Sequence, residues 1–215
     1  MIGKKMNLDL FKLFSLTKKQ NDLLIHFEKL IFDWNKKINL ISRRDIDNFK
    51  LNHIVHSLSM SLYFQFNNGT KILDLGTGGG LPGIPLAIIF PNVNFHLIDK
   101  VGKKIAVVSD IVNSLKLRNV KTEWVNVTNL NSSYDFVISR SVASYQKIFK
   151  QCENIFLKDD KNEFENGFIF YKGGTIEEEF KMAKKYYTHE LSKEINLDFF
   201  NEKKIVHVPN PYTHI

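Results

Sequence analysis

The stretch Lys71-Ile72-Leu73-Asp74-Leu75-Gly76-Thr77-Gly78-Gly79-Gly80-Leu81 decides the fold of this chain. Its first five residues have the short apolar pattern of a buried strand, and glycines follow directly. Residues 81–90 are apolar, with Pro82 and Pro85 near their start, where a helix tolerates proline. The stretch therefore predicts a strand, a tight glycine loop and a helix.

The rest of the chain repeats this alternation. The hydrophobic patterns predict further strands over residues 94–98, 120–125, 134–139, 167–172 and 204–208. They predict helices over residues 103–115, 143–156 and 176–187. Strands that alternate with helices imply an α/β fold, whose mostly parallel sheet is covered by helices on both faces.

The N-terminal part has a different pattern. Thr17 and Gln20 have the spacing of a capping box, and apolar residues then recur at helical spacing up to Trp34. A second helical pattern runs from Leu51 to Leu62 and ends before a turn signal at residues 67–69. We expect residues 1–66 to form a helical extension packed on a core domain of residues 67–215.

Composition limits the class of protein. The chain has 215 residues, of which 43% are hydrophobic, enough for one sizeable core. It has neither a spanning run of about 18 apolar residues nor a signal sequence, so we expect a cytoplasmic protein, and a monomer. The single cysteine, Cys152, lacks partners at zinc-ligand spacing, so we expect a buried thiol and no metal site.

The charge favours an anionic partner. The formal net charge is +7, and residues 1–50 hold eleven lysines and arginines, among them Lys4, Lys5, Arg43 and Arg44, against six acidic residues. These residues can form a surface that contacts phosphates, with Lys36 and Lys37 as candidates. They can equally be lysines on an ordinary solvated face.

The glycine loop is the strongest candidate for a ligand site. Glycines at a strand-to-helix turn let the backbone approach a ligand closely. Gly76, Gly78 and Gly80 fit G-x-G-x-G, whereas the dinucleotide fingerprint needs glycine at Leu81, which disfavours NAD. Asp74, two residues before the first glycine, suits the ammonium group of a bound amino acid. The alternative is a turn that merely needs glycine.

Three further positions lie where strands end. Asp99 closes the second strand, where a carboxylate can take both ribose hydroxyls of an adenosine, although it can also cap the next helix. Val127 and Thr128 follow the third strand, beside the expected adenine edge or in a loop without a ligand role. Ser139 and Arg140 close the fourth strand, and Arg140 is either a ligand contact or a surface arginine.

Histidines and tryptophans give weaker signals. His53 and His56 could share one helix face, but two histidines without a third ligand are more often packing residues than a metal site. Trp34 and Trp124 are interpreted as core residues.

Six motifs together resemble one family, the bacterial 16S ribosomal RNA guanine-N7 methyltransferases (RsmG, formerly GidB). The resemblance extends from residue 34 to about residue 174, and the glycine loop extended by Leu81-Pro82-Gly83-Ile84-Pro85 is its most specific part. The motifs are Trp34-Asn35-Lys36-Lys37-Ile38-Asn39-Leu40, His53-Ile54-Val55-His56-Ser57-Leu58, residues 72–85, residues 97–104, Phe136-Val137-Ile138-Ser139-Arg140 and Tyr171-Lys172-Gly173.

The resemblance implies a Rossmann-like class I fold that uses S-adenosylmethionine (SAM), with a seven-stranded, mostly parallel sheet and an N-terminal helical extension. It implies methylation of N7 of a guanine in the decoding-region loop, with 16S ribosomal RNA or the small-subunit particle as partner and no membrane. Cofactor contacts in that family would fall on Gly76, Leu81, Val127, Thr128 and Arg140.

The sequence departs from the family pattern at three places. Gly79 stands where the family usually has proline, and Thr128 stands where it has an acidic residue. Ser141-Val142-Ala143 follows Arg140 where Ala-Phe-Ala is typical. The tail of residues 207–215 matches nothing in the pattern.

Chemistry at guanine N7 would not require a general base, because N7 already carries an in-plane lone pair. The sequence accordingly assigns no catalytic acid or base, and Arg140, Ser139 and Lys172 are candidates for positioning the substrate. Three alternatives remain open: a dinucleotide-dependent oxidoreductase, a non-catalytic RNA-binding protein on the same fold, and a SAM-dependent methyltransferase of another substrate, such as a small molecule.

Overall fold

The computed structural model describes residues 10–42, 45–140, 143–152 and 154–211. Lys4, Lys5, Arg43 and Arg44 from the basic N-terminal quarter, the Ser141-Val142 departure and the last four residues of the tail lie outside the described residues.

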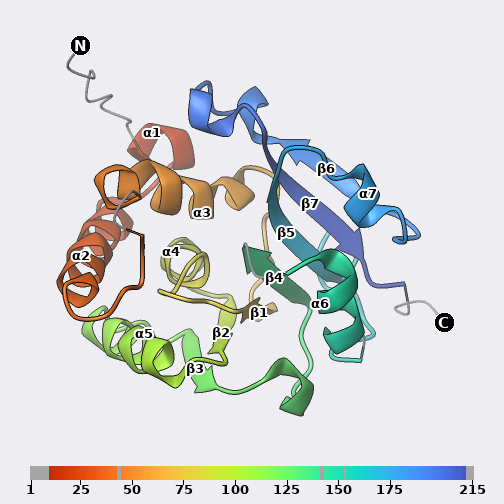
Figure 1. Ribbon diagram of the computed structural model, residues 1–215, viewed down its shortest axis with the longest axis horizontal. Coiled ribbons are helices and arrows are strands. Elements are labelled where there is room, and N and C mark those ends of the chain that lie inside the picture. Colours follow the sequence, from red (N-terminus) through yellow and green to blue (C-terminus); the bar gives the residue numbers. More distant parts are fainter. Residues whose placement is uncertain (1–9, 43–44, 141–142, 153, 212–215) are drawn as a thin grey trace.

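A seven-stranded sheet forms the centre of the molecule (Figure 1). The strand order is β3-β2-β1-β4-β5-β7-β6, and β7 runs in the direction opposite to the other six strands. The expectation of a seven-stranded, mostly parallel sheet is therefore confirmed. The strands are β1 Lys71–Leu75, β2 Asn94–Asp99, β3 Val120–Trp124, β4 Phe136–Arg140, β5 Gly167–Gly173, β6 Tyr187–Glu190 and β7 Lys203–Pro209.

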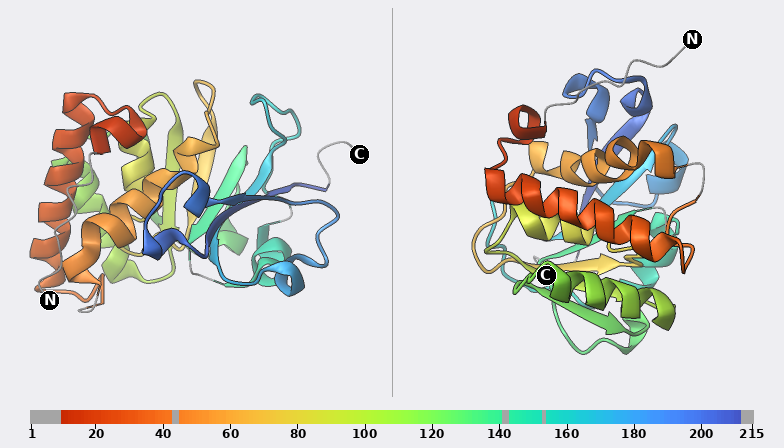
Figure 2. Two further views of the ribbon diagram at one scale, coloured as in Figure 1. Left: turned by 90° about the horizontal axis from the view of Figure 1, so that it is seen from above. Right: turned by 90° about the vertical axis from the view of Figure 1, so that its left-hand side faces the viewer.

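Side chains alternate between the two faces of this sheet, and each face has its own apolar core. Ile72, Phe136 and Tyr171 pack in the core that contains α2, α4 and α5, whereas Val137 and Phe168 pack in the core that contains α6 and α7 (Figure 2). The helices are α1 Leu10–Phe14, α2 Lys18–Asn35, α3 His56–Leu58, α4 Gly83–Ile89, α5 Gly102–Ser114, α6 Tyr145–Cys152 and α7 Glu177–Phe180.

Helix α2 is held against the core near both of its ends. Thr17 and Gln20 form the expected capping box at the start of α2. The Gln20 side chain also donates to the carbonyl of Ile89 at the end of α4 (3.1 Å). Near the other end of α2, Trp34 Nε1 donates to Asp110 Oδ2 on α5 (3.0 Å). Helix α2 is thereby fixed relative to α4 and α5.

The second N-terminal pattern is not one regular helix. It consists of a 3₁₀ turn over Ile46–Asn48, a π-helical turn over Lys50–Val55, the short α3 and a further 3₁₀ turn over Ser59–Leu62. The expected apolar face still forms, because Ile54, Val55 and Leu58 are buried.

Three expectations about helices and tryptophan were wrong. The helix expected over residues 176–187 ends at Phe180, and Tyr187–Glu190 forms the edge strand β6 on β7. The helix expected over residues 143–156 is confined to Tyr145–Cys152, where Cys152 is buried and burial raises the pKa of its thiol to about 12. Trp124 is 71% exposed.

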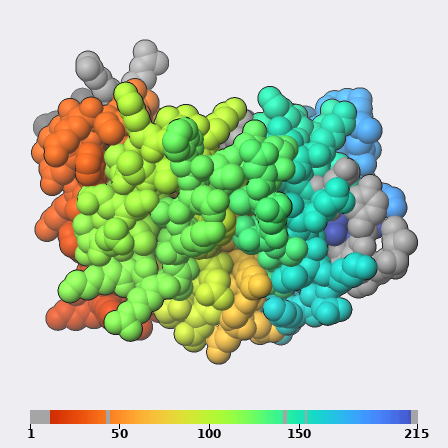
Figure 3. Space-filling view, turned by 90° about the horizontal axis from the view of Figure 1, so that it is seen from below, coloured from red at the N-terminus to blue at the C-terminus, as the bar shows by residue number. Residues whose placement is uncertain are grey.

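Strand β1 lies inside the sheet, and β3 and β6 form its two edges. Figure 3 shows one face on which the N-terminal residues, the middle third and the C-terminal third follow one another from left to right. None of the helices within the described residues is long and apolar enough to cross a membrane.

Candidate functional site

A pocket of about 720 Å³ lies where the strand order reverses, beyond the carboxyl ends of β1 and β4. Ligands of open α/β sheets bind at this kind of position, and the volume suits a nucleoside-sized molecule. One half of its wall comes from the loops that follow β1, β2 and β3. The N-terminal segment contributes residues from Leu40 to His56 to the other half, and residues of α6 together with Phe199 and Lys203 complete the wall.

The glycine loop after β1 forms the floor of the first half. Gly76, Gly78 and Gly80 have positive φ angles of 72°, 59° and 86°, which L-residues rarely adopt. A Cβ at Gly78 would have only the carbonyl oxygen of Gly76 at 4.0 Å, so this position opens to the pocket. A Cβ at Gly80 would instead collide with Ile84 on α4. Gly78 thus leaves room for a ligand, whereas Gly80 leaves room for the helix.

Asp74 is placed to hold this loop together, because its Oδ2 accepts hydrogen bonds from Thr77 Oγ1 (2.6 Å) and the Gly83 amide (2.9 Å). The carboxylate is fully buried and does not line the pocket, and burial raises its pKa to about 6. A Cβ at Gly83 would come within 2.6 Å of the same oxygen. The Leu-Pro-Gly part of the motif therefore closes the loop onto Asp74.

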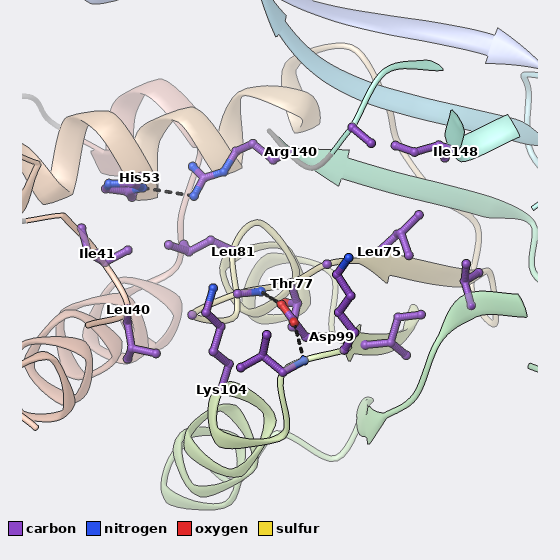
Figure 4. Close-up of a pocket in the computed structure, with 18 of the residues that line it drawn as sticks. Leu40, Ile41, His53, Leu75, Thr77, Leu81, Asp99, Lys104, Arg140 and Ile148 are labelled. Atoms are coloured by element: carbon purple, nitrogen blue, oxygen red, sulfur yellow. Dashed lines mark hydrogen bonds between the residues drawn. The ribbon is translucent and has the colours of Figure 1, made fainter. Parts of the chain in front are cut away.

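Asp99 joins the glycine loop to the next helix (Figure 4). Its Oδ2 accepts from the Gly78 amide (3.0 Å), and its Oδ1 accepts from the Val101 amide (2.9 Å), one residue before α5 begins. Asp99 is nearly buried yet lines the pocket. Each carboxylate oxygen can accept more than one hydrogen bond, so these contacts leave acceptor capacity for a ligand hydroxyl.

Only one of the two residues expected at the adenine edge lines the pocket. Val127 is buried and contributes to the wall together with Val125 and Asn126. Thr128 is exposed and does not line it, and its amide donates to Asn126 Oδ1 (3.3 Å). Asn126 was not singled out in the sequence.

Arg140 lines the pocket at the end of β4 and is not a surface arginine. Because side chains alternate along a strand, Arg140 points to the same side of the sheet as the N-terminal segment. There its guanidinium contacts His53 Nδ1 at 3.1 Å (Figure 4). Burial lowers the pKa of the Arg140 guanidinium. Arg140 therefore lies at the boundary between the two halves of the pocket.

Ser139 and Lys172 do not join Arg140. Ser139 is buried on the opposite face of β4, where its Oγ lies 3.4 Å from the Leu75 carbonyl oxygen. In the register of β4 and β5, Arg140 lies beside Tyr171, so Lys172 also points to the opposite face. Lys172 forms a partly buried ion pair with Glu179 on α7 (2.6 Å). Neither side chain lines the pocket.

Both histidines of the N-terminal motif line the pocket, which the sequence did not indicate. His56 is buried against the rings of Tyr171 and Phe199. Burial lowers the pKa of His56 far below its usual range and that of His53 to about 4, and nearby Arg140 contributes in both cases. Both imidazoles are consequently neutral near pH 7.

Asn35 explains why the motif of residues 34–40 reaches the pocket. Its Oδ1 accepts from the amides of Leu40 (2.8 Å) and Ile41 (2.9 Å), and its Nδ2 donates to the Ile41 carbonyl (3.2 Å). Leu40 and Ile41 line the pocket, and Leu40 Cβ is close to the position that a Cβ at Gly79 would take (3.6 Å).

Positive charge lies along the pocket wall. In addition to Arg140, the lining includes Lys104 on α5, Lys147 on α6 and Lys203 on β7. Several cations around one cleft favour an anionic ligand. Among the residues that the structure describes, no group of three or more His, Cys, Asp or Glu side chains could hold a metal ion.

The strand order, the glycine loop after β1 and the carboxylate that ends β2 define a class I SAM-dependent methyltransferase. Solved structures agree with this fold at low sequence identity. A SAM-dependent methyltransferase from Aquifex aeolicus has a TM-score of 0.55 and 13% identity over 74% of this chain and 92% of that one. A chain of a fibrillarin/Nop5p complex has a TM-score of 0.52 and 15% identity over 71% of this chain and 79% of that one.

The family is more specific than the class. The family model described as rRNA small subunit methyltransferase G matches residues 20–207, and the chain belongs to this family. A relative with that name from Christiangramia forsetii is 43% identical over 209 residues, which cover 96% of this chain and 99% of the relative. The relative from Bacteroides thetaiotaomicron is 41% identical over 193 residues, covering 89% and 94%. The resemblance inferred from the sequence motifs is thus confirmed.

Proposed function

We propose that this protein transfers a methyl group from SAM to N7 of a guanine in the decoding-region loop of 16S ribosomal RNA. The observation that carries the proposal is the two-part pocket, in which a nucleoside-sized half and an N-terminal half meet at Arg140. Family membership supports the choice of RNA. We further propose a cytoplasmic monomer in which residues 1–66 are an extension of the domain formed by residues 67–215.

The first half of the pocket fits SAM. The open space at Gly78 is a cradle that a Cβ would fill, and Asp99 offers carboxylate lone pairs beside it. We assign contacts to five residues that all line the pocket: Gly76, Gly78, Leu81, Asp99 and Val127. Asp74 and Thr128 do not line it. We therefore propose that Asp74 acts on the cofactor only through the loop that it holds.

The reaction needs positioning more than proton transfer. SAM, when bound, supplies a methyl group that is activated by its sulfonium. The N7 lone pair forms the new C–N bond as the C–S bond breaks and its electrons pass to sulfur, so no proton has to leave the base. The task of the chain is to hold N7 about 3–3.5 Å from the methyl carbon and in line with the breaking bond.

The product base carries a positive charge, so the pocket must accommodate a cation that forms on guanine. Among the described residues, Arg140 is held by the neutral His53 and by no carboxylate, which leaves its other N–H groups available to a phosphate or to guanine O6. Lys104, Lys147 and Lys203 would meet the RNA backbone at the same cleft.

The test is to incubate the protein with small-subunit RNA, and separately with small-subunit particles, from a strain that lacks this gene. Methyl-labelled SAM is supplied, and nuclease digests are analysed by mass spectrometry. We expect labelled 7-methylguanosine at a single site of the decoding region.

The alternatives give different results in the same experiment. Label on a small molecule would indicate another substrate, and RNA binding without label would indicate a non-catalytic binding protein. Retention on immobilised NAD without SAM binding would indicate an oxidoreductase.

A further inference from the structure

The His53 ring occupies a fixed position between the N-terminal segment and Arg140. It lies in the π-helical turn Lys50–Val55 and packs against Phe49, with ring centroids 5.3 Å apart. Ser57 Oγ donates to the His53 backbone carbonyl (2.6 Å), which braces the turn. Single π-helical turns occur frequently at functional sites.

The contact with Arg140 decides which nitrogen of His53 carries the proton. A guanidinium has only hydrogen-bond donors, so His53 Nδ1, 3.1 Å from Arg140, must be the acceptor. In the neutral ring the proton then lies on Nε2. This Nε2 is buried and has no hydrogen-bond partner among the described residues, although the residue lines the pocket.

The carboxylate whose charge acts on His53, Asp45, is bonded elsewhere. Asp45 Oδ2 accepts from Ser42 Oγ (2.6 Å), and its Oδ1 is 3.4 Å from Asn52 Nδ2. A buried N–H without a partner is unfavourable, and such groups in native proteins require an explanation. Because His53 Nε2 has almost no accessible surface, a ligand acceptor reaches it only when binding displaces the side chains that cover it, and such an acceptor would satisfy the N–H.

The target base offers such an acceptor next to its reacting atom. Guanine presents N7 and O6, which are both acceptors, whereas adenine presents N7 and an amino group, which is a donor. When N7 faces the methyl group, the substituent at position 6 lies beside it. The Nε2–H of His53 is a donor only, so it can bind an oxygen at this position but not an amino group.

We propose that His53 determines the specificity for a 6-oxopurine by donating its Nε2–H to O6 of the target guanine, while its Nδ1 accepts from Arg140. The inference rests on the proposed N7 methylation and names the residue that reads the base at that site. Arg140 fixes the tautomer of His53, and His53 in turn holds Arg140 in the pocket.

Two substitutions separate the two nitrogens of the ring. His53→Asn places an amide oxygen near the position of Nδ1, so it keeps the acceptor for Arg140 and loses the distal donor. His53→Gln reaches farther and restores a donor near the position of Nε2. His189→Asn is the matched control, because His189 is another partly buried histidine, and it stacks on Tyr63 outside the pocket.

The assay uses short decoding-loop RNAs with guanine, inosine or 2,6-diaminopurine at the target position. Inosine keeps O6 and lacks the 2-amino group, whereas 2,6-diaminopurine keeps the 2-amino group and replaces O6 by an amino group. We expect the wild type to methylate guanine and inosine at rates within about tenfold and to disfavour 2,6-diaminopurine by about 10⁴-fold in kcat/KM.

His53→Asn should lower that preference for the 6-oxo base by about 100-fold, with the Kd for SAM unchanged. His53→Gln should recover most of the preference, and His189→Asn should retain it. If His53→Asn keeps the wild-type ratio within twofold, the assignment of His53 is wrong although N7 methylation stands. If the wild type labels no guanine N7 in any RNA, the proposed function itself fails.

Discussion

Gly78→Val tests whether the glycine loop is a ligand cradle or merely a tight turn. The φ angle of Gly78 is +59°, and an L-residue in the left-handed region costs about 1–2 kcal/mol. No atom other than the Gly76 carbonyl oxygen lies within 4.0 Å of the added Cβ, so the substitution should cause no collision within the chain. The new methyl groups would instead extend into the pocket.

Gly69→Val is the matched control for backbone strain. Gly69 has a φ of +79°, also has open space around its Cβ, and lies in the turn that precedes β1, outside the pocket lining. Both variants should lose about 1–2 kcal/mol of unfolding free energy, which for a chain of this length is a fall in Tm of about 2–8 °C.

Isothermal titration calorimetry should separate the two variants. Gly78→Val is expected to weaken SAM binding by at least tenfold, equivalent to about 1.4 kcal/mol, whereas Gly69→Val should bind SAM as the wild type does. If both variants bind SAM with wild-type affinity while both lose stability, the loop is a turn and not a cradle.

Four further variants test individual residues. Arg140→Ala should lower kcat/KM for RNA by about 100-fold with a small change in Tm, and a Tm collapse with full activity of the folded fraction would make the residue structural. Lys172→Met should destabilise the fold by about 1–3 kcal/mol, because Glu179 loses its ion-pair partner. The kcat/KM of the folded variant should stay within twofold of the wild-type value. A selective loss of methylation would contradict the placement of Lys172 on the face opposite to Arg140. Asp74→Asn should keep the SAM Kd within about twofold. Asp74 has a pKa of about 6 in the folded protein and 3.8 in the unfolded chain, so the folded wild type binds a proton first as the pH falls below about 6, and this proton stabilises it. Asp74→Asn lacks this gain, so its free energy of unfolding should decrease relative to the wild type over the same pH range. Urea unfolding at several pH values checks this sign. Replacing Lys36 and Lys37 by Glu should weaken RNA binding and flatten its salt dependence by about 0.7 per lost phosphate contact, and an unchanged slope would assign both lysines to an ordinary solvated face.

The sequence predicted the parts of the fold that have strong local signals. The apolar run before Gly76 and the glycines themselves specify β1, its loop and α4 without knowledge of distant contacts. Strand β6 was missed because Tyr187-Thr188-His189-Glu190 lies at an exposed sheet edge and lacks apolar alternation. The expected helix of residues 176–187 failed for the same reason, because exposed polar residues fit either structure.

The candidate site was predictable where residues follow directly from strand ends. Gly78, Asp99, Val127 and Arg140 all line the pocket, as their positions after β1 to β4 indicate. The face to which each side chain points was not predictable, because Ser139 and Lys172 differ from Arg140 only through strand alternation and the register between β4 and β5.

The contribution of the N-terminal segment could not be read from spacing. His53 reaches Arg140 across 87 positions in the sequence, and only the packed fold brings the two side chains together.

A crystal structure of the protein with S-adenosylhomocysteine tests the central claim most directly. We expect the amino acid part to lie over Gly76 and Gly78, the ribose hydroxyls to bond to Asp99, and the sulfur to face the space beside Arg140 and His53. An empty pocket at saturating ligand, or a ligand bound elsewhere on the molecule, would contradict the assignment of this pocket.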